Sequence, residues 1–580
     1  MFHIDHGTQD RHAIILQLKD PDAGMEMFLH DPKYETCIRY INGNPMDKKD
    51  LERCDLMNAK TCILLTNKNS KDAIGMDHKN LLIGLAMKKF VFQNQKFRGQ
   101  NEPSMSLCMQ LIKPESKQHY FSSINVNSNT DQIIIVEEIK MNMMSKSCFS
   151  PGIINFISNL IASTGDQGEQ EYDWLNQYAD GMGHEIYRIK LSTKMGGRTF
   201  AEISGLVYEE NRSIVFAIEI KTNGSTIIRL NPSDFIVNNI DENQIYVYTI
   251  CEDKDAAQEI ETIHMTKDEI NRYFTAKAQA DKIAKEEELL NKEAGPGAGE
   301  ASRRAVPEGT SQPEIDELDD DMNLGDADEQ FLKDTEDQKM MQDYYVWDAP
   351  TSSMEVTLAS LENDPRVKNH IVVCGIHSAI KSFIMPLRAK YLKDIQLQKI
   401  VIITGEPDER GGDQIDSEIW NQISRFQYVF LVNGSPLKQQ TLHKANINYA
   451  DKVVILGHDS TLNSAISDHE MLDAESIYIY QAVKKVNKDV QILTELVYSS
   501  NIEFLLPIYP PNNDYHLSTL YAAGEVYISA IIDTLTCQSY FNPHIVTILQ
   551  QILKGASEED DEQLRDMMRA HPDLTQSNLW

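Results

Sequence analysis

The sequence predicts an α/β protein with two Rossmann-like units in tandem, the first with a small β-rich lobe, joined by an acidic disordered linker. Three observations predict this class. Short apolar runs alternate with helix-spaced segments in residues 12–136 and again in 370–496, a pattern typical of parallel sheets with crossover helices. One segment recurs in both stretches. A long acidic passage poor in apolar residues separates them.

Composition excludes several classes of protein. The chain has 580 residues and a net charge of -33, so it repels phosphate backbones and we expect no nucleic acid partner. No segment approaches the roughly 20 apolar residues that span a bilayer. The amino terminus lacks the apolar core of a signal peptide. The eight cysteines show no CxxC pair and are expected to be reduced thiols. If the chain is complete as given, it is soluble and cytoplasmic.

The first Rossmann-like lobe is expected at residues 1–146. Such a unit usually begins with a strand that runs into a glycine-rich turn, but here the first apolar run already resembles a second strand. The first strand of this lobe is therefore predicted to be missing. A helix is expected over 77–92, and strands are expected at 12–18, 37–41, 61–66 and 106–112.

The middle of the chain is expected to contain three segments. After a Pro-Gly break, crossover helices are predicted at 147–170, and alternating strands predict a β-rich lobe at 171–265. Residues 266–345 read as a charged helix and an acidic linker. With few apolar residues to bury, this linker cannot offset its ordering entropy. A tract that binds divalent cations is the alternative interpretation.

The second Rossmann-like lobe is expected at 346–512, followed by interface helices at 513–556 and an acidic tail at 557–580. The segments SPGIINFISNLIA (150–162) and EVYISAIIDTLTC (525–537) are too apolar for solvent and are predicted to be helices that hold paired lobes together. Strands are predicted at 370–375, 399–404, 428–432, 452–456 and 490–496.

An internal duplication links the two lobes. Residues 40–66 and 430–456 share the frame N-G-[NS]-P-[ML]-x-x-x-x-L, followed by a Val/Ile/Leu strand. Such self-similarity indicates two copies of one structural unit.

The motifs of common catalysts and cofactor sites are absent. The turn at 373–378 has one glycine and no G-x-G-x-x-G, so a dinucleotide cofactor is not expected. No nucleophile–base–orienter set is evident, and His78 and His377 are interpreted as surface or helix-capping residues. The chain is predicted not to be an enzyme and to have no cofactor.

Three carboxylates allow a cation site. Asp72 and Asp77 flank the entry to a predicted helix, where carboxylates also stabilise the helix dipole. Glu219 lies inside an apolar strand. Carboxylates from separate segments are how a site for a hard cation is built, but helix capping alone also explains the two aspartates.

Long stretches of this sequence resemble a known family. They include WLNQYADGMGHEIY (174–187), NGSPLKQQTLHKANINYAD (433–451), LTELVYSSNIEFL (493–505) and AAGEVYISAIIDTLTCQSYF (522–541). The chain resembles the tandem RCK (regulator of potassium conductance) region of large-conductance, ion-activated potassium channels, of the calcium-activated BK and sodium-activated Slack types. The resemblance covers most of residues 12–555.

The resemblance implies where ions would bind. The acid-rich calcium loop of the BK type is absent, since 507–518 keeps Asp514 as its single acid. A second calcium site of that type matches Asp72, Asp77 and Glu219, with a main-chain ligand at Ile186. A sodium site of the Slack type begins at a position matching Asp408, but its companion histidine is not found. Calcium or sodium is therefore the regulatory ion that the resemblance implies.

Two functions follow from the resemblance. The first is the gating-ring region of an ion-activated potassium channel on the cytosolic side of a membrane, as a homo-oligomer (a tetramer by family precedent) or with other RCK subunits. A channel pore would then be encoded upstream, since pore and voltage-sensor segments are expected to be absent from this chain. The second is a pore-less, RCK-derived scaffold protein in a larger assembly, such as a cytoskeletal one.

Overall fold

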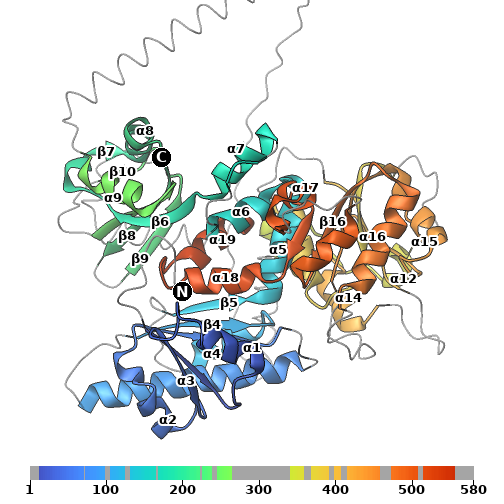
Figure 1. Cartoon of the computed structure of the whole chain (residues 1–580). Coiled ribbons are helices and arrows are strands. Elements are labelled where there is room, and N and C mark those ends of the chain that lie inside the picture. The colour runs from blue at the N-terminus through green and yellow to red at the C-terminus, as the bar shows by residue number, and fades with distance from the viewer. Residues whose placement is uncertain are drawn as a thin grey trace, which may run out of the picture. The chain divides into compact units, whose positions relative to one another are not determined.

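The computed structural model (Figure 1) describes most of the chain. The chain divides into two units, a compact unit made of the residues up to 261 and from 343 onward and a second unit made of residues 262–342. The predicted charged helix and acidic linker at 266–345 lie almost wholly outside the described residues, as does the tail at 557–580. The described residues are 12–97, 105–123, 131–263, 340–357, 367–390, 397–405, 415–457, 472–506 and 514–555, with gaps at 69, 71, 163, 165–167, 171, 223–224 and 238–243.

The second half of the compact unit (residues 343–555) contains a parallel sheet of six strands among the described residues, five of which were predicted. In sheet order the strands are β14 (Val429–Val432), β13 (Ile400–Ile403), β12 (His370–Cys374), β15 (Ala450–Ile455), β16 (Gln491–Leu496) and β17 (Val526–Ile528). Two of these strands, β12 and β13, are buried at every residue and are apolar except for His370, as expected of a parallel sheet covered by helices. The helices of this half are α12 (Ser353–Val356), α13 (Ile380–Leu387), α14 (Ser417–Ile423), α15 (Gln439–Lys444), α16 (Ala474–Val486), α17 (Thr519–Ala522), α18 (Ile531–Gln538) and α19 (Ile545–Lys554).

One predicted helix is in fact a strand and a helix. The segment 525–537 was expected to be helical throughout, but Val526–Ile528 form β17, which pairs in parallel with β16. These Val-Tyr-Ile side chains are all buried, and β-branched and aromatic residues fit a pleated, buried surface better than a helix. The helix α18 starts only at Ile531. The predicted boundary at 512/513 therefore separates β17 from the sheet to which it belongs.

The first half (residues 12–263) begins with two smaller parallel sheets in place of one. They consist of β1 (Ala13–Gln17) with β2 (Ile38–Asn42), and of β3 (Thr61–Leu64), β4 (Ser106–Leu111) and β5 (Gln132–Ile135). The helices around them are α1 (Ala23–Leu29), α2 (Lys48–Arg53), α3 (Ala73–Phe97) and α4 (Ser116–Ser123).

The internal repeat folds as the sequence predicts. The order β2–α2–β3 matches β14–α15–β15, and in both copies a short 3-10 turn precedes the second strand. The repeated glycine has a structural reason: a Cβ on Gly43 would meet the Asp50 side chain at 2.8 Å, and one on Gly434 would meet Thr441 at 2.5 Å. Asp50 and Thr441 hold the same place in the two copies of the repeat. The turn is therefore packed in the same way in both.

The repeat also identifies a strand of the second half that has no counterpart among the described residues of the first half. By position β1 corresponds to β13 and β3 to β15, and in the second half β12 lies between these two strands. Among the described residues, no strand pairs with both β1 and β3. That the first lobe lacks its first strand stays a prediction, since residues 1–11 lie outside the described part of the chain.

Crossover helices and an antiparallel lobe complete the first half. The helices are α5 (Val136–Phe149), α6 (Ile153–Ile161) and α7 (Asp173–Met182). Because α5 is one continuous helix, the predicted boundary at 146/147 falls inside it. The predicted β-rich lobe is a four-stranded antiparallel sheet in the order β6 (Glu185–Lys190), β11 (Gln244–Cys251), β8 (Ile214–Thr222) and β9 (Ser225–Leu230). It is accompanied by β7 (Arg198–Thr199), α8 (Phe200–Asn211), β10 (Ile236–Val237) and α9 (Lys254–Thr262).

Two further features match the sequence. All eight cysteines lie in the described residues and are free thiols, and burial raises the pKa of Cys148 and Cys374 to about 12. No helix of the described residues has both the length and the apolar character that a membrane crossing requires.

Candidate functional site

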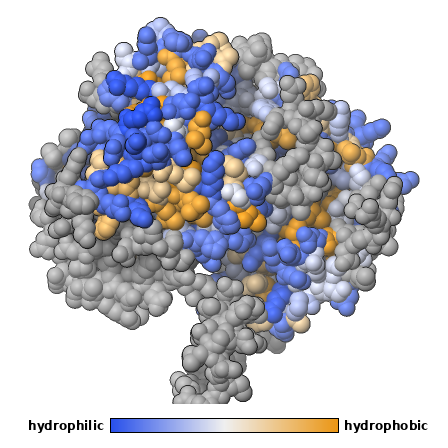
Figure 2. Space-filling view, turned by 90° about the horizontal axis from the view of Figure 1, so that it is seen from below, coloured by the Kyte–Doolittle hydropathy of each residue, from blue (hydrophilic) through white to orange (hydrophobic). Residues whose placement is uncertain are grey.

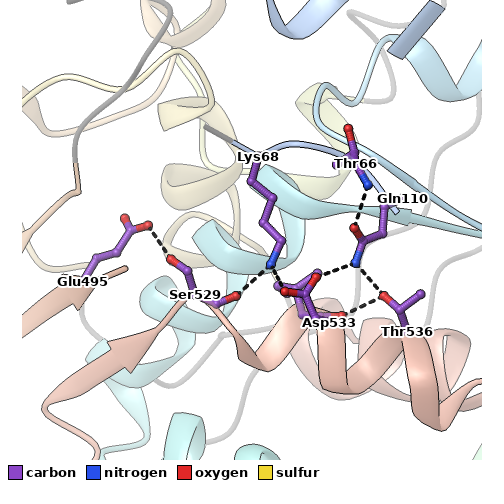
Figure 3. A network of polar contacts seen from close by, with 8 residues as sticks. Thr66, Lys68, Gln110, Glu495, Ser529, Asp533 and Thr536 are labelled. Atoms are coloured by element: carbon purple, nitrogen blue, oxygen red, sulfur yellow. Dashed lines mark hydrogen bonds and ion pairs between the residues drawn. The ribbon is translucent and has the colours of Figure 1, made fainter. Parts of the chain in front are cut away.

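A polar network joins the two halves of the compact unit, and it includes Gln110 on β4 (Figure 3). The Gln110 side chain is fully buried. Its Oε1 accepts from the backbone N–H of Thr66 at 3.2 Å, and its Nε2 donates to Asp533 Oδ1 at 3.0 Å and to Thr536 Oγ1 at 2.8 Å. Asp533 and Thr536 lie on α18, in the second half. The amide thus connects a loop and a strand of one half to a helix of the other.

Glu495 on β16 makes the corresponding contacts in the second half. Its Oε2 accepts from the backbone N–H of Gly457 at 2.9 Å, and its Oε1 accepts from Lys140 Nζ at 3.2 Å and Ser529 Oγ at 3.4 Å. Lys140 lies on α5, in the first half, and both charged side chains are about nine-tenths buried. A buried carboxylate that accepts several bonds is satisfied without water.

Gln110 and Glu495 are equivalent residues of the duplication. Each is the fifth residue of its strand, and Thr66 and Gly457 match in the repeat. The helices that they contact also correspond, since α5 follows β5 directly and α18 follows β17 after a short turn. Each half therefore binds the crossover helix of the other through the same strand position, which is the contact pattern of a pseudo-two-fold pair.

Lysines add further links between the halves. Lys68 Nζ donates to Asp533 Oδ2 at 2.7 Å and to the Ser529 carbonyl at 3.1 Å. Lys452 Nζ donates to the Cys148 carbonyl at 2.6 Å. The Asp533 side chain is 49% exposed, so water screens its ion pair with Lys68. The bond from Gln110 to Thr536 and the bond from Lys140 to Glu495 are buried.

The structure gives Asp77 a structural role. Its buried carboxylate accepts from the backbone N–H groups of Ile112 at 2.7 Å and Lys113 at 2.9 Å, and from Ser116 Oγ at 2.8 Å. Asp72 caps the start of α3, where its Oδ1 accepts from the Gly75 N–H at 2.8 Å. Asp72 therefore has the helix-capping role that the sequence offered as the alternative to ion binding. Asp77 lies within α3 and instead anchors the backbone that follows β4.

Asp473 repeats the role of Asp77 in the second half. Its carboxylate accepts from the N–H groups of Val497 at 2.7 Å and Tyr498 at 3.0 Å, and from Asn501 Nδ2 at 2.7 Å. In both halves the two bonded amides directly follow the end of a strand, β4 or β16. Because Asp77 and Asp473 accept equivalent hydrogen bonds from the backbone, these bonds explain the buried carboxylate of Asp77 without a bound ion.

Glu219 forms a buried ion pair on the antiparallel lobe. Its two oxygens accept from Arg188 Nε at 2.7 Å and Nη2 at 2.6 Å, and Tyr248 donates to it at 2.9 Å. Burial would raise the pKa of Glu219, but these bonds and the Arg188 charge outweigh it and hold the pKa below its ordinary value. His544 Nε2 lies 3.7 Å away, and burial lowers its pKa.

The predicted ion ligands are not brought together. Asp72, Asp77 and Glu219 have separate partners, and the described residues contain no group of three His, Cys, Asp or Glu that could hold a metal. The carbonyl of Ile186, the expected main-chain ligand, accepts from Asn542 Nδ2 at 2.8 Å. Asp408 and residues 507–513 lie outside the described part of the chain.

Sequence reasoning missed the residues of the network and misjudged one histidine. Sequence reasoning did not single out Gln110, Lys140 or Glu495. Gln110 and Glu495 are polar residues within apolar strands, and they occupy matched positions of the duplicated unit. The occurrence of a polar residue at the same position of two equivalent apolar strands could have identified Gln110 and Glu495. His377 was expected at the surface or as a cap; it accepts from the Ala379 N–H at 3.1 Å but is buried, with Lys140 Nζ 3.2 Å from its Nε2.

Comparison with known proteins agrees with this architecture. The model of the calcium-activated potassium channel slowpoke-like RCK domain matches residues 1–145 and 366–494, and that of the calcium-activated BK potassium channel alpha subunit matches 131–218. The human potassium channel subfamily U member 1 is 23% identical over 92% of this chain and 49% of its own length. The human potassium channel subfamily T member 1 is 23% identical over 95% of this chain and 49% of its own length. The chain therefore spans about half the length of these relatives.

A solved structure supports the fold. The human SLO3 gating ring superposes with a TM-score of 0.64 at 19% identity, covering 94% of this chain and 86% of that one. The slowpoke-like RCK model matches residues in both repeated lobes. The chain thus resembles slowpoke-like RCK domains in both repeated lobes, and it shares the fold of the SLO3 gating ring.

Proposed function

We propose that this chain acts as the gating-ring region of an ion-activated potassium channel and regulates potassium conduction from the cytosolic side of a membrane, without catalysis of its own. The observation that carries the proposal is the pairing of two RCK lobes in one chain. Each lobe binds the other's crossover helix through an equivalent strand residue, Gln110 or Glu495.

The pairing of the two halves is suited to a domain that transmits a movement to another part of a protein. A motion of one half relative to the other would break buried bonds at both equivalent positions, and a buried polar group left unpaired is costly. The pair is therefore expected to move as one body. An ion shifts the conformation of such a body only as far as its affinity differs between the two states.

Assembly into a ring is part of the proposal. We expect several copies of the chain, four by family precedent, or this chain with other RCK subunits, to place the paired lobes around a common axis below a channel pore. The net charge of -33 favours cations near the surface of such a ring.

Calcium or sodium is the proposed regulatory ion. Binding through Asp72, Asp77 and Glu219 would require each carboxylate to exchange its present partners for the ion, and Glu219 would have to leave Arg188. Calorimetric titration of the chain with calcium, and separately with sodium, tests this. Heat that disappears in Glu219→Gln supports the set, and heat unchanged by Glu219→Gln and Asp77→Asn rejects it.

Electrophysiology tests the function itself. This chain would replace the matching region of the human potassium channel subfamily U member 1, and excised patches would be recorded at several cytosolic ion concentrations. We expect potassium currents whose open probability depends on the ion and is altered by Gln110→Leu. A chimera that reaches the membrane and conducts with no ion dependence would contradict the proposal and favour the scaffold function.

A further inference from the structure

His377 lies in the turn between β12 and α13, where the second half contacts α5 of the first half. Its ring is only 2% exposed. The Nδ1 atom lies 3.1 Å from the backbone nitrogen of Ala379, and the Nε2 atom lies 3.2 Å from Nζ of Lys140 on α5. A backbone N–H and an ammonium group are both hydrogen-bond donors. The ring therefore has a donor next to each of its two nitrogens.

A protonated ring does not fit between these two donors. A neutral imidazole accepts a hydrogen bond at one nitrogen, and a protonated imidazole accepts at neither. Neutral His377 thus satisfies one donor, whereas protonated His377 leaves both unsatisfied. Protonation also places a positive charge 3.2 Å from the ammonium group of Lys140. The contact between His377 and α5 is therefore compatible with the neutral ring alone.

Four charged side chains lie around this turn. Lys140 Nζ pairs with Glu495 Oε1 on β16, and Lys113 Nζ, from the loop after β4, pairs with Glu137 Oε2 on α5, both at 3.2 Å. Lys113 also donates to the hydroxyl of the residue after His377. Each carboxylate is thus already matched by a lysine. The ammonium group in direct contact with the ring is therefore the charge that opposes protonation most strongly.

Water decides what happens to His377 when α5 moves away. Hydrophilic side chains cover much of the face of the molecule that Figure 2 shows, and water solvates charges there. His377 is buried, and an unmatched buried charge is costly. If α5 separates from the turn, water reaches the ring, which then binds a proton at a pH of about 6.5, as a solvated histidine does.

We propose that His377 makes the docking of α5 on the second half sensitive to pH, because the separated form binds a proton that the docked form excludes. Docking is then at full strength above a pH of about 6.5 and weakens as the pH falls below that value. Uptake of one proton changes the docking equilibrium by up to about tenfold per pH unit. The inference does not depend on the channel function.

Hydrogen exchange of the full chain at pH 7.5 and pH 5.5 tests the inference. Most residues of α5 are buried, so its amides report separation from the second half. Each rate is divided by the rate of an unstructured peptide at the same pH, which leaves the opening equilibrium of the helix. We expect this equilibrium to shift towards the open form by about tenfold at the lower pH. An equilibrium that does not change with pH overturns the inference.

Two variants identify the residue responsible. His377→Gln keeps a hydrogen-bond acceptor and binds no proton, so α5 should open equally at both pH values. His370→Gln is the matched control, since His370 is also buried in the second half but bonds to the carbonyl of Ala445. This control should keep the pH effect on α5. A pH effect that persists in His377→Gln, or that is lost as fully in His370→Gln, contradicts the inference.

The thermal midpoint at pH 7.5 shows whether each variant folds. His377→Asn, which also binds no proton and keeps an acceptor, repeats the test if His377→Gln does not fold.

Discussion

Gly524 packs directly against the backbone of Gly152, so that a Cβ at position 524 would lie 2.6 Å from the Cα of Gly152. Both glycines have positive φ, 71° and 87°. Gly152 precedes α6, and Gly524 lies between α17 and β17. The two chain segments, one from each half, can approach this closely because neither carries a side chain at the contact.

The contact predicts an asymmetric pair of variants. Gly524→Ala should lower stability by more than the roughly 1–2 kcal/mol of left-handed strain, because its methyl group would clash with backbone that cannot yield. Gly152→Ala is the control, since a Cβ there would meet nothing within 4 Å and would cost strain alone. Thermal unfolding of the two variants measures the difference, and equal midpoints would contradict the close contact.

Gln110→Leu should lower the free energy of unfolding by about 1–3 kcal/mol, because the partly buried Thr66 N–H and the buried Thr536 hydroxyl both lose their partner. Lys68→Met, which removes the half-exposed ion pair to Asp533, should cost less than about 1 kcal/mol and less still at high salt. Chemical denaturation at low and high salt compares them. If Lys68→Met were the more damaging change, the buried amide would not be what holds the halves together.

Asp77→Asn and Asp473→Asn should have similar effects, about 1–3 kcal/mol each. In both cases an amide NH2 group would replace a carboxylate oxygen that now accepts hydrogen bonds. Matched losses of stability in calcium-free buffer would establish equivalent anchors. A variant of Asp77 that is stable without calcium but has lost a calcium response would instead identify an ion ligand.

Glu219→Ala should be more damaging, at about 3 kcal/mol or more, because it leaves Arg188, 22% exposed, without its buried partner. Arg188→Ala should have a comparable effect, and the double variant should recover part of the loss. A double-mutant cycle from denaturation curves measures the coupling. Strictly additive effects would show that the two side chains do not stabilise each other.

Acidification should destabilise the second half through His370. Its Nε2 donates to the Ala445 carbonyl at 2.9 Å, its buried Nδ1 has no hydrogen-bond partner, and burial lowers its pKa. The unfolded chain binds this proton at a pH of about 6.5, so stability is full above that value and declines as the pH falls towards the lower folded pKa. His370→Gln should reduce this slope between pH 7.5 and 5.5, and an unchanged slope would exclude His370 as its source.

The sequence by itself determined the α/β class, the β-rich lobe and the duplication. The shared N-G-[NS]-P frame encodes a tight turn, and apolar runs with period-two or helical spacing encode strands and helices locally. These features need no knowledge of distant contacts. The free cysteines were predictable as well, since the sequence has no paired cysteine motif.

Tertiary structure alone decided what the polar residues do. Val526–Ile528 became a strand because β16 offers an edge, which local propensity does not report. Asp77 and Glu219 were predicted to form one site, but each carboxylate accepts hydrogen bonds from different donors. A buried carboxylate is stable only where several donors surround it. Gln110 and Glu495 acquired their roles because pairing of the two lobes brought α18 and α5 to them, across several hundred residues of chain.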